Sequence, residues 1–436
     1  MAKMIVAHPL PGFSGRVAVE EFGLSFIGGF TGPVEVPAHI QTRLTGAGYT
    51  LNANPASHPG NEYVLEADLS NPASPASVAL RAAFERRRLT LYNPAGLDKW
   101  RVALGNRRTS PVRVLVEGNS NWEGTGAADF AQRLPVVLNA ELRARYGLTG
   151  AANPYVTRSY ITPAPTNAPY TISGTVGTSQ FGLGARGWSI AEGGGTITVP
   201  FTGDRVRVNY IRGGAAGIIT LVLDGGAPVT INTVNASETG GQWDSGVLTR
   251  GPHTLVISRD PSSVSTRQIY INGVETYDGD FTSGIRVYDA GKHGLAAATL
   301  AASPHGERHE YPLAGPFGLI ILGLGENDGA VTKAAYKTSI EAILTRYRGY
   351  GFTGSFLLCH GPLPGGGFDS TRWDEFGAAE REIAEASTDV AALDLSASIP
   401  GYATGNALGI YADTKHNNSA GQAWRADLVR AALVPA

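Results

Sequence analysis

The sequence predicts an α/β protein: a doubly wound parallel sheet that is interrupted by an all-β sandwich and preceded by a small N-terminal region. Strand-like apolar runs alternate with helical patterns over residues 106–150 and again over 285–436. Between these parts, residues 155–284 carry short β-rich runs separated by glycine turns. The 57 glycines also favour many turns and short strands over long helices.

Charge and composition exclude several classes of protein. The formal net charge of −2 gives no reason to expect a nucleic-acid partner, and no apolar run approaches the ~20 residues of a membrane span. A single cysteine, Cys359, excludes an intrachain disulfide framework and a cysteine-based zinc cluster. The N-terminus lacks the apolar core of a secretory signal. We therefore expect a protein that is made in the cytoplasm and that reaches the outside, if it does, without a signal peptide.

Residues 1–105 are predicted to form an attachment or packing region. Helical patterns occur at 36–49 and 77–88, and the segments between them are rich in Asn, Pro and Ser. The histidines of this region are far apart in the sequence, so no catalytic group is expected here.

The stretch VRVLVEGNSNWEGTG, residues 112–126, is the centre of the first α/β part. Its mostly apolar, β-branched beginning is typical of a buried parallel strand, and the run breaks at Gly118. Ser120 follows at once, and apolar residues then recur at helical spacing from about Ala127 to Tyr146. This order places a hydroxyl at the carboxyl end of a strand, where open α/β sheets bind their ligands.

A Pro- and Thr-rich linker at 154–169 leads into the predicted sandwich. Six strand-like runs follow: Thr196–Phe201, Arg205–Ile211, Ile218–Leu223, Val229–Val234, His253–Ser258 and Arg267–Ile271. They resemble loosely the jelly-roll, galactose-binding-like modules that accompany carbohydrate-active enzymes. The motif GLGARG, Gly182–Gly187, matches GxGxxG, but no strand–helix unit surrounds it, so we interpret it as a loop rather than a nucleotide site.

The α/β pattern resumes at Ile285, so the sandwich is predicted to be inserted and not appended. The expected strands are Ile285–Ala290, Phe317–Leu324, Thr353–Leu358 and Val390–Leu395. Helical patterns alternate with them at 332–347, 375–386 and 420–433.

Five residues at predicted strand ends or turns could supply the groups that ester hydrolysis needs. Ser120 is the candidate nucleophile. Asp413 precedes His416 by three residues, so that on a turn the carboxylate can orient the imidazole towards the serine. Gly294 offers a backbone N–H, and Asn327 offers a side-chain amide.

Together these blocks resemble those of the SGNH (GDSL-type) hydrolases. The stretch 112–126 resembles the GDSxxEGxG block, and DAGKHG (Asp289–Gly294) resembles the block that ends in an oxyanion glycine. GENDG (Gly325–Gly329) matches the GxND block, and DTKHNNSAGQ (Asp413–Gln422) resembles DxxHxxxxG. The blocks occur in the family's order. The resemblance covers about 106–150 and 285–436.

The resemblance implies a flavodoxin-like sheet and a metal- and cofactor-independent esterase. Ser120 would attack the acyl carbon, His416 would act as base and then acid, and Asp413 would orient it. The N–H groups of Ser120 and Gly294 and the amide of Asn327 would hold the oxyanion. The supporting residues would be Gly118, Asn119, Glu123 and Asp328.

Some positions depart from the family pattern or stand outside it. Asn119 replaces the usual Asp, which is not a triad member. His293 and His360 are interpreted as pocket-wall or loop residues. An α/β-hydrolase shares the order Ser, Asp, His, but no serine of this chain occurs in G-x-S-x-G.

The sequence therefore predicts a serine esterase that removes acyl groups, most simply acetyl, from a cell-envelope glycan. The glycine-rich chain without a signal resembles tail-associated proteins of phages that infect actinobacteria, which suggests other virion tail proteins as partners and the virion or cell exterior as its location. Two alternatives remain open. One is a lipid or mycolyl esterase with a wide apolar groove, and the other is a non-catalytic receptor-binding or structural tail protein.

Overall fold

The computed structural model describes residues 90–161, 164–302 and 307–434, together with five short strands between Ile5 and Asn52. The chain divides into two compact units, Met1–Arg87 and Arg88–Ala436. The strands of the first unit are β1 (Ile5–Pro9), β2 (Val17–Val19), β3 (Leu24–Phe26), β4 (Pro33–Val34) and β5 (Tyr49–Asn52). β1 lies between β4 and β5 in an antiparallel sheet, and β2 pairs with β3. Apart from Tyr49, which begins β5, the helices expected at 36–49 and 77–88 lie outside the described residues.

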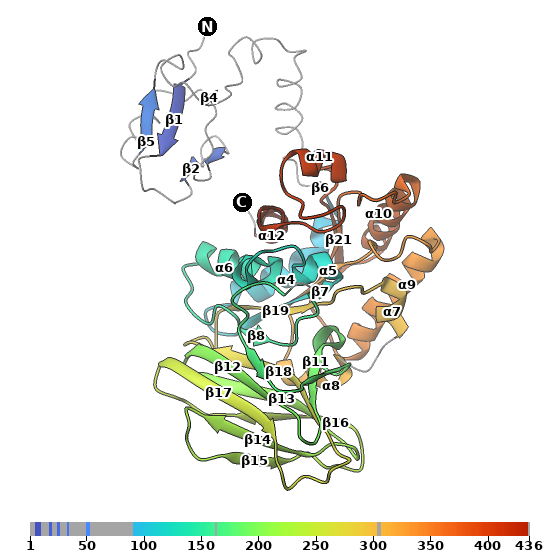
Figure 1. Ribbon diagram of the computed structural model, residues 1–436. Helices are drawn as coiled ribbons and strands as arrows, with labels where there is room; N and C mark the ends of the chain where they lie inside the picture. The colour runs from blue at the N-terminus through green and yellow to red at the C-terminus, as the bar shows by residue number, and fades with distance from the viewer. Residues whose placement is uncertain are drawn as a thin grey trace. The chain divides into compact units, whose positions relative to one another are not determined.

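Six strands form the central sheet of the second unit (Figure 1). From edge to edge they are β19 (Ile285–Gly291), β7 (Val112–Gly118), β20 (Leu319–Gly323), β21 (Ser355–His360), β22 (Val390–Asp394) and β6 (Thr90–Tyr92). The first five are parallel, and β6 runs antiparallel to β22. Numbered by their order along the chain, the five parallel strands lie across the sheet in the order second, first, third, fourth, fifth. The direction of winding therefore reverses between β7 and β20, and the carboxyl ends at such a reversal are where open α/β sheets bind their ligands.

Helices cover both faces of this sheet. The helices on one face are α4 (Asp98–Gly105), α6 (Leu134–Arg145) and α12 (Ser419–Leu433). Those on the other are α7 (Ala297–Ala302), α8 (Glu307–Ala314), α9 (Lys333–Gly349) and α10 (Ser370–Glu385). Successive strand residues alternate between the two cores, since Leu115 belongs to one and Val114 and Val116 to the other. Both faces are buried, which explains the nearly continuous apolar runs in the sequence.

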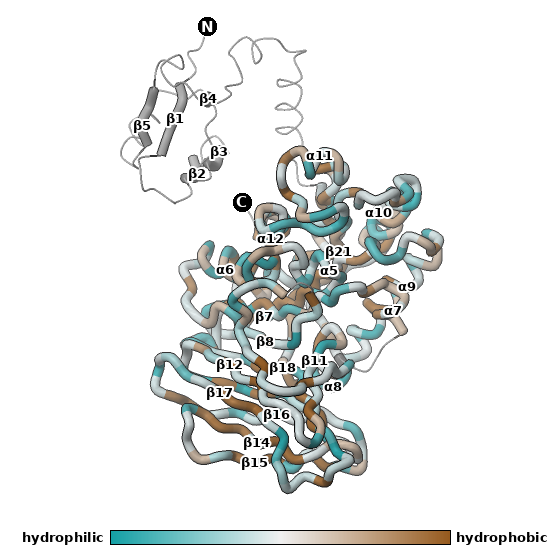
Figure 2. Tube along the Cα trace, in the orientation of Figure 1, coloured by the Kyte–Doolittle hydropathy of each residue, from teal (hydrophilic) through white to brown (hydrophobic). Residues whose placement is uncertain are grey.

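Two antiparallel sheets lie in sequence between α6 and β19, and they pack face to face. The first contains β8 (Tyr155–Val156), β10 (Gly177–Ser179), β11 (Gly187–Ile190), β13 (Arg205–Arg212), β16 (Thr239–Asp244) and β18 (Ile269–Tyr277). The second contains β9 (Thr171–Ser173), β12 (Thr196–Gly203), β14 (Ile218–Leu223), β15 (Val229–Asn232) and β17 (Gly251–Arg259). Inward residues such as Ile197, Val199 and Ile257 form their shared core. Figure 2 shows these apolar stretches along β14 and β17.

Two expected boundaries differ in the structure. The first region was expected to extend to residue 105, but β6 and α4 belong to the central sheet and its covering layer because β6 pairs with β22. The helix expected from Ala127 begins only at Leu134. The chain before it is held out of the helix, because Phe130 donates its N–H to the carbonyl of Thr166 and Asp129 caps a short 3₁₀ turn, η4 (Phe130–Gln132).

Within the described ranges no helix is long and apolar enough to cross a membrane, and no group of three or more His, Cys, Asp or Glu residues could hold a metal ion.

Candidate active site

Ser120 follows the carboxyl end of β7, which pairs with β20, in the turn that the sequence predicts. It is the first residue of the short helix α5 (Ser120–Glu123) and is 5% exposed. The turn needs Gly118, since a Cβ there would lie 2.3 Å from the carbonyl oxygen of Gly323. Asn119 caps α5 by accepting a hydrogen bond of 3.0 Å from the N–H of Asn121. The backbone geometry therefore fixes where the hydroxyl stands.

The loop before α12 brings His416 and Asp413 to this serine. His416 Nε2 is 2.9 Å from Ser120 Oγ, and His416 Nδ1 is 2.7 Å from Asp413 Oδ2. The other oxygen of Asp413 accepts the backbone N–H groups of Lys415 and His416 at 2.7 and 2.8 Å. Partial burial would raise the pKa of Asp413, but these hydrogen bonds outweigh it and lower the pKa below its ordinary value. An ionised carboxylate only accepts, so Nδ1 carries the proton and Nε2 presents its lone pair to the serine.

The loop after β19 presents Gly294 with a left-handed φ of +76°. The three preceding N–H groups are all used: Gly291 donates to Asp289 (3.2 Å), Lys292 to Gly118 (2.8 Å) and His293 to Glu123 (2.7 Å). Over the described residues, the N–H of Gly294 has no hydrogen-bond acceptor. This N–H is therefore available to a ligand.

Asn327 belongs to the adjoining loop after β20. One N–H of its side chain donates to the carbonyl of Leu295 at 3.0 Å, which leaves a second N–H on the same nitrogen. Asp328 is buried and accepts the N–H groups of Ala297 and Gly325. Burial raises the pKa of Asp328, and its hydrogen bonds brace the loop instead of pointing to the serine. The expectation that Asp328 supports its loop agrees with these contacts.

A buried polar cluster beneath the turn was not found from the sequence. Asn119 donates its side-chain amide to Glu326 Oε2, and Glu326 Oε1 lies 3.7 Å from Arg425 Nη2. Asn121 donates to Glu326 and to the carbonyl of Lys415, which ties the turn that carries Ser120 to the loop that carries His416. An aspartate at 119 would place a second carboxylate against Glu326, so the amide suits this pair. The sequence did contain a sign of this cluster, because a charged residue, Glu326, occupies the variable second position of the GxND block.

His293 and His360, which lie outside the Ser120–His416–Asp413 line of hydrogen bonds, differ in their surroundings. His293 is exposed, and its ring stacks on His416 with centroids 5.8 Å apart. His360 is buried against Trp373, where burial lowers its pKa to about 4. His360 also lines a cavity of about 270 Å³ with Glu380. Only His293 contacts a member of the Ser–His–Asp line.

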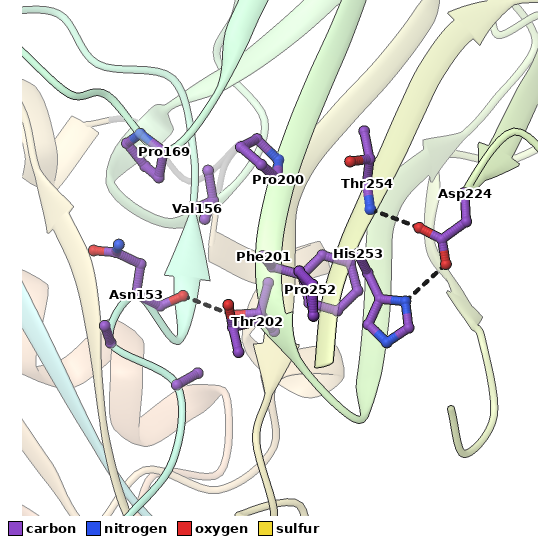
Figure 3. Close-up of a pocket in the computed structure, with 13 residues that line it drawn as sticks. Asn153, Val156, Pro169, Pro200, Phe201, Thr202, Asp224, Pro252, His253 and Thr254 are labelled. Carbon is purple, nitrogen blue, oxygen red and sulfur yellow. Dashed lines mark hydrogen bonds and ion pairs between the residues drawn. The ribbon is translucent and has the colours of Figure 1, made fainter. Parts of the chain in front are cut away.

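Two cavities border the sandwich. One of about 530 Å³ borders the Gly294 loop and is lined by Lys292 and Leu295 together with Gln180 and Ala185 of the sandwich. Another, of about 480 Å³, lies between the segment that leaves α6 and the second sandwich sheet (Figure 3). There Asp224 bonds both His253 Nδ1 (2.7 Å) and the N–H of Thr254 (2.8 Å). None of the residues that line this second cavity belongs to the Ser–His–Asp line.

Known proteins resemble this chain only in their folds. No protein-family model matches it, and no curated protein is detectably similar in sequence. A solved structure of a peptidoglycan O-acetylesterase ("in action, 5 min") matches at 16% identity. The match covers 78% of this chain and 95% of that chain, with a TM-score of 0.54. A carbohydrate esterase family 2 enzyme plus carbohydrate binding domain from Corynascus thermopiles (Myceliophthora fergusii) matches at 12% identity, 60% and 98% coverage and a TM-score of 0.29. A family two carbohydrate esterase from Clostridium thermocellum in complex with cellohexaose matches at 13% identity, with 60% of this chain and 97% of that chain covered and a TM-score of 0.27. The mixed α/β fold of this chain is thus one that a solved O-acetylesterase structure also has.

Proposed function

We propose that this protein is a serine esterase that removes O-acyl groups, foremost acetyl, from a cell-envelope glycan. One observation carries the proposal: Ser120, His416 and Asp413 form a line of hydrogen bonds of 2.9 and 2.7 Å at the carboxyl edge of the sheet. This is the arrangement in which a base activates a hydroxyl and a carboxylate orients the base. The fold shared with a peptidoglycan O-acetylesterase supports the choice of substrate class.

In this mechanism Ser120 Oγ attacks the acyl carbon while His416 Nε2 takes its proton. The imidazolium is stabilised by Asp413, and the oxyanion is held by the N–H groups of Ser120 and Gly294 and by the amide of Asn327. His416 then gives the proton to the sugar oxygen, which leaves as an alcohol. Water repeats the sequence against the acyl-enzyme, which releases the carboxylate and restores the serine.

The wider organisation is proposed on the same basis. The chain comprises an N-terminal attachment region, a flavodoxin-like SGNH hydrolase layer and an inserted carbohydrate-binding-like sandwich. The strand order of second, first, third, fourth, fifth supports the hydrolase layer. The cavity of about 530 Å³, bordered by both the Gly294 loop and the sandwich, supports a polymeric substrate that contacts both parts. We also propose a phage-tail or extracellular location with other tail proteins as partners, which the sequence resemblance alone supports.

Hydrolysis of short- and long-chain nitrophenyl esters and of O-acetylated peptidoglycan, by wild type and Ser120→Ala, tests the function. Loss of the nucleophile lowers kcat by on the order of 10⁴–10⁶. Ser339→Ala, an exposed serine on α9, is the matched control and keeps the wild-type rate. Preference for long acyl chains would favour the lipid or mycolyl esterase. Envelope binding without any turnover in the wild type would favour the non-catalytic tail protein.

A further inference from the structure

The GLGARG turn, Gly182–Gly187, is a contact between the sandwich and the catalytic layer. It contains the 3₁₀ turn η5 (Leu183–Ala185) and lies directly against β19. Gly184 has φ of +66°, and a Cβ there would lie 2.0 Å from the carbonyl oxygen of Ala290. A Cβ on Gly182 would lie 2.2 Å from the carbonyl oxygen of Arg186. Gly184 therefore has a packing reason, namely close approach to the strand that leads into the Gly294 loop, whereas Gly182 is needed for the tight turn itself.

This turn delivers Arg186, whose side chain is 1% exposed, beneath that loop. Its Nη1 lies 2.9 Å from Asp289 Oδ1 and also donates to the carbonyl of Gly291. Its Nε donates to the carbonyl of Arg158 at 2.7 Å, and its Nη2 is 3.7 Å from Glu123 Oε1. Burial by itself would lower the pKa of Arg186, but the two carboxylates raise it, so the guanidinium stays charged. A residue of the sandwich thus contacts both Asp289 and Gly291 at the carboxyl end of β19.

Glu123 is the link from Arg186 to the loop. It is fully buried, three residues after Ser120, and its Oε2 accepts the N–H of His293 at 2.7 Å. Its Oε1 accepts the N–H of Tyr160 at 2.6 Å and the hydroxyl of Ser159 at 3.1 Å. The same carboxylate therefore joins the segment that enters the sandwich to the residue directly before Gly294.

We propose that Arg186 is a positioning residue for ester hydrolysis and that the sandwich completes the oxyanion site through it. By fixing the Gly291 carbonyl and the Glu123 carboxylate, Arg186 sets the orientation of the loop that presents the Gly294 N–H. The proposal rests on the function proposed above, since it concerns the oxyanion of that reaction. It also assigns the GLGARG motif a role that needs no nucleotide.

The test compares Arg186→Lys with Arg212→Lys, an exposed arginine at the end of β13, in the full chain. Lysine keeps the charge but cannot donate to Gly291, Arg158 and Asp289 in a fixed fork. We expect kcat for nitrophenyl acetate to fall by about 10²-fold, the effect of a misplacement of about 1 Å, with KM little changed. The acid side of the kcat–pH profile stays unchanged, because Arg186 contacts no member of the Ser–His–Asp line. A folded Arg186→Lys protein with wild-type kcat overturns the proposal.

If Arg186→Lys does not fold, Ser159→Ala decides. It removes the hydrogen bond that the Ser159 hydroxyl donates to Glu123 and the one that it accepts from the N–H of Ile161, and Ser173→Ala on the exposed strand β9 is its control. We expect Ser159→Ala to lower kcat several-fold at constant KM, whereas wild-type kcat would contradict the proposal. Failure of the proposed function is distinguishable from failure of this proposal. In that case the wild type hydrolyses no ester, or Ser120→Ala hydrolyses the ester at the wild-type rate.

Discussion

Two buried contacts join the sandwich to the α/β layer, and they differ in charge. Around Arg186, two guanidinium groups meet two carboxylates: Arg133 Nη1 lies 3.0 Å from Asp289 Oδ2 on the far side from Arg186. Around Glu310 of α8, the partners are neutral, because the amides of Asn209 and Asn272 each donate to it at 2.8 Å. The first contact lies beside the Gly294 loop, and the second lies between α8 and the first sandwich sheet.

The difference shows what each contact contributes. Replacing a buried ion pair by well-packed apolar residues is often neutral for stability, so the charged contact is of most value for the geometry it imposes. Burial raises the pKa of Glu310 to about 8, although its hydrogen bonds from the amides lower it, so this carboxyl is mostly protonated at neutral pH. The stability that the contact around Glu310 provides is therefore lost at alkaline pH. The stability of the contact around Arg186 is lost when one partner of its ion pairs is removed.

The largest effect is expected from Asp289→Asn. It keeps the shape of the side chain but leaves Arg133 and Arg186 without the carboxylate that both contact. Removing one partner of a buried pair costs about 3–5 kcal/mol, and urea unfolding measures that loss. Asp98→Asn, in an exposed pair with Arg101, is the control and should change stability by about 1 kcal/mol or less. Equal effects of the two variants would remove the distinction between the buried charged contact and a surface pair.

Glu310→Gln tests the neutral contact by its pH dependence. The pKa of Glu310 is raised in the folded chain, so the folded state binds more protons than the unfolded state between about pH 4.5 and 8. Stability is therefore lost as pH rises through about 8, while below about pH 4.5 the contribution is fully present. The groups that face this carboxyl are Tyr155, Asn209, Asn272 and Glu275.

We expect Glu310→Gln to abolish this part of the pH dependence and, at pH 8.5, to be more stable than wild type by on the order of 5 kcal/mol. Urea midpoints at pH 5.5 and 8.5 measure the difference. Glu380, whose pKa burial also raises to about 8, is present in both proteins, so its contribution cancels. Parallel pH slopes for the two proteins would show that Glu310 is ionised in the folded state.

The smallest effect is expected at the surface of the sandwich. Hydrogen bonding to Asp224 raises the pKa of His253, so the pair stabilises the fold fully below about pH 6.5 and this contribution is lost as pH rises through the folded pKa. His253→Gln should lower the melting temperature slightly at pH 5.5 and not at pH 9, because exposed pairs contribute about 1 kcal/mol or less. A loss of equal size at both pH values would point to packing against Phe201 instead of charge.

The sequence located the elements whose signal is local. The apolar run of β7 and the glycine turn before Ser120 were readable, and the strands from Ile285, Phe317 and Val390 were found within a few residues. Sequence could not place β6, a strand of three residues that exists because β22 offers it an edge.

The missed site residues, Arg186 and Glu326, were set by contacts across long sequence distances. Arg186 meets Asp289 across 103 positions, and Asn119 meets Glu326 across 207. Neither contact can be predicted from the periodicity of the sequence. Each depends on how one turn packs against another strand end or turn in the folded chain. The Ser120–His416 pair, 296 positions apart, was anticipated only because its short blocks resembled a family.

The buried arginine of the GLGARG turn also bears on engineering. A domain can be replaced as a unit only where the layer beside it needs none of its side chains. Here a substitute module would have to bring a guanidinium to Asp289 and a hydroxyl and an N–H to Glu123 at the same places. Chimeras of this chain should therefore be cut outside residues 158–187, so that the graft retains the native turn and replaces only the outer strands.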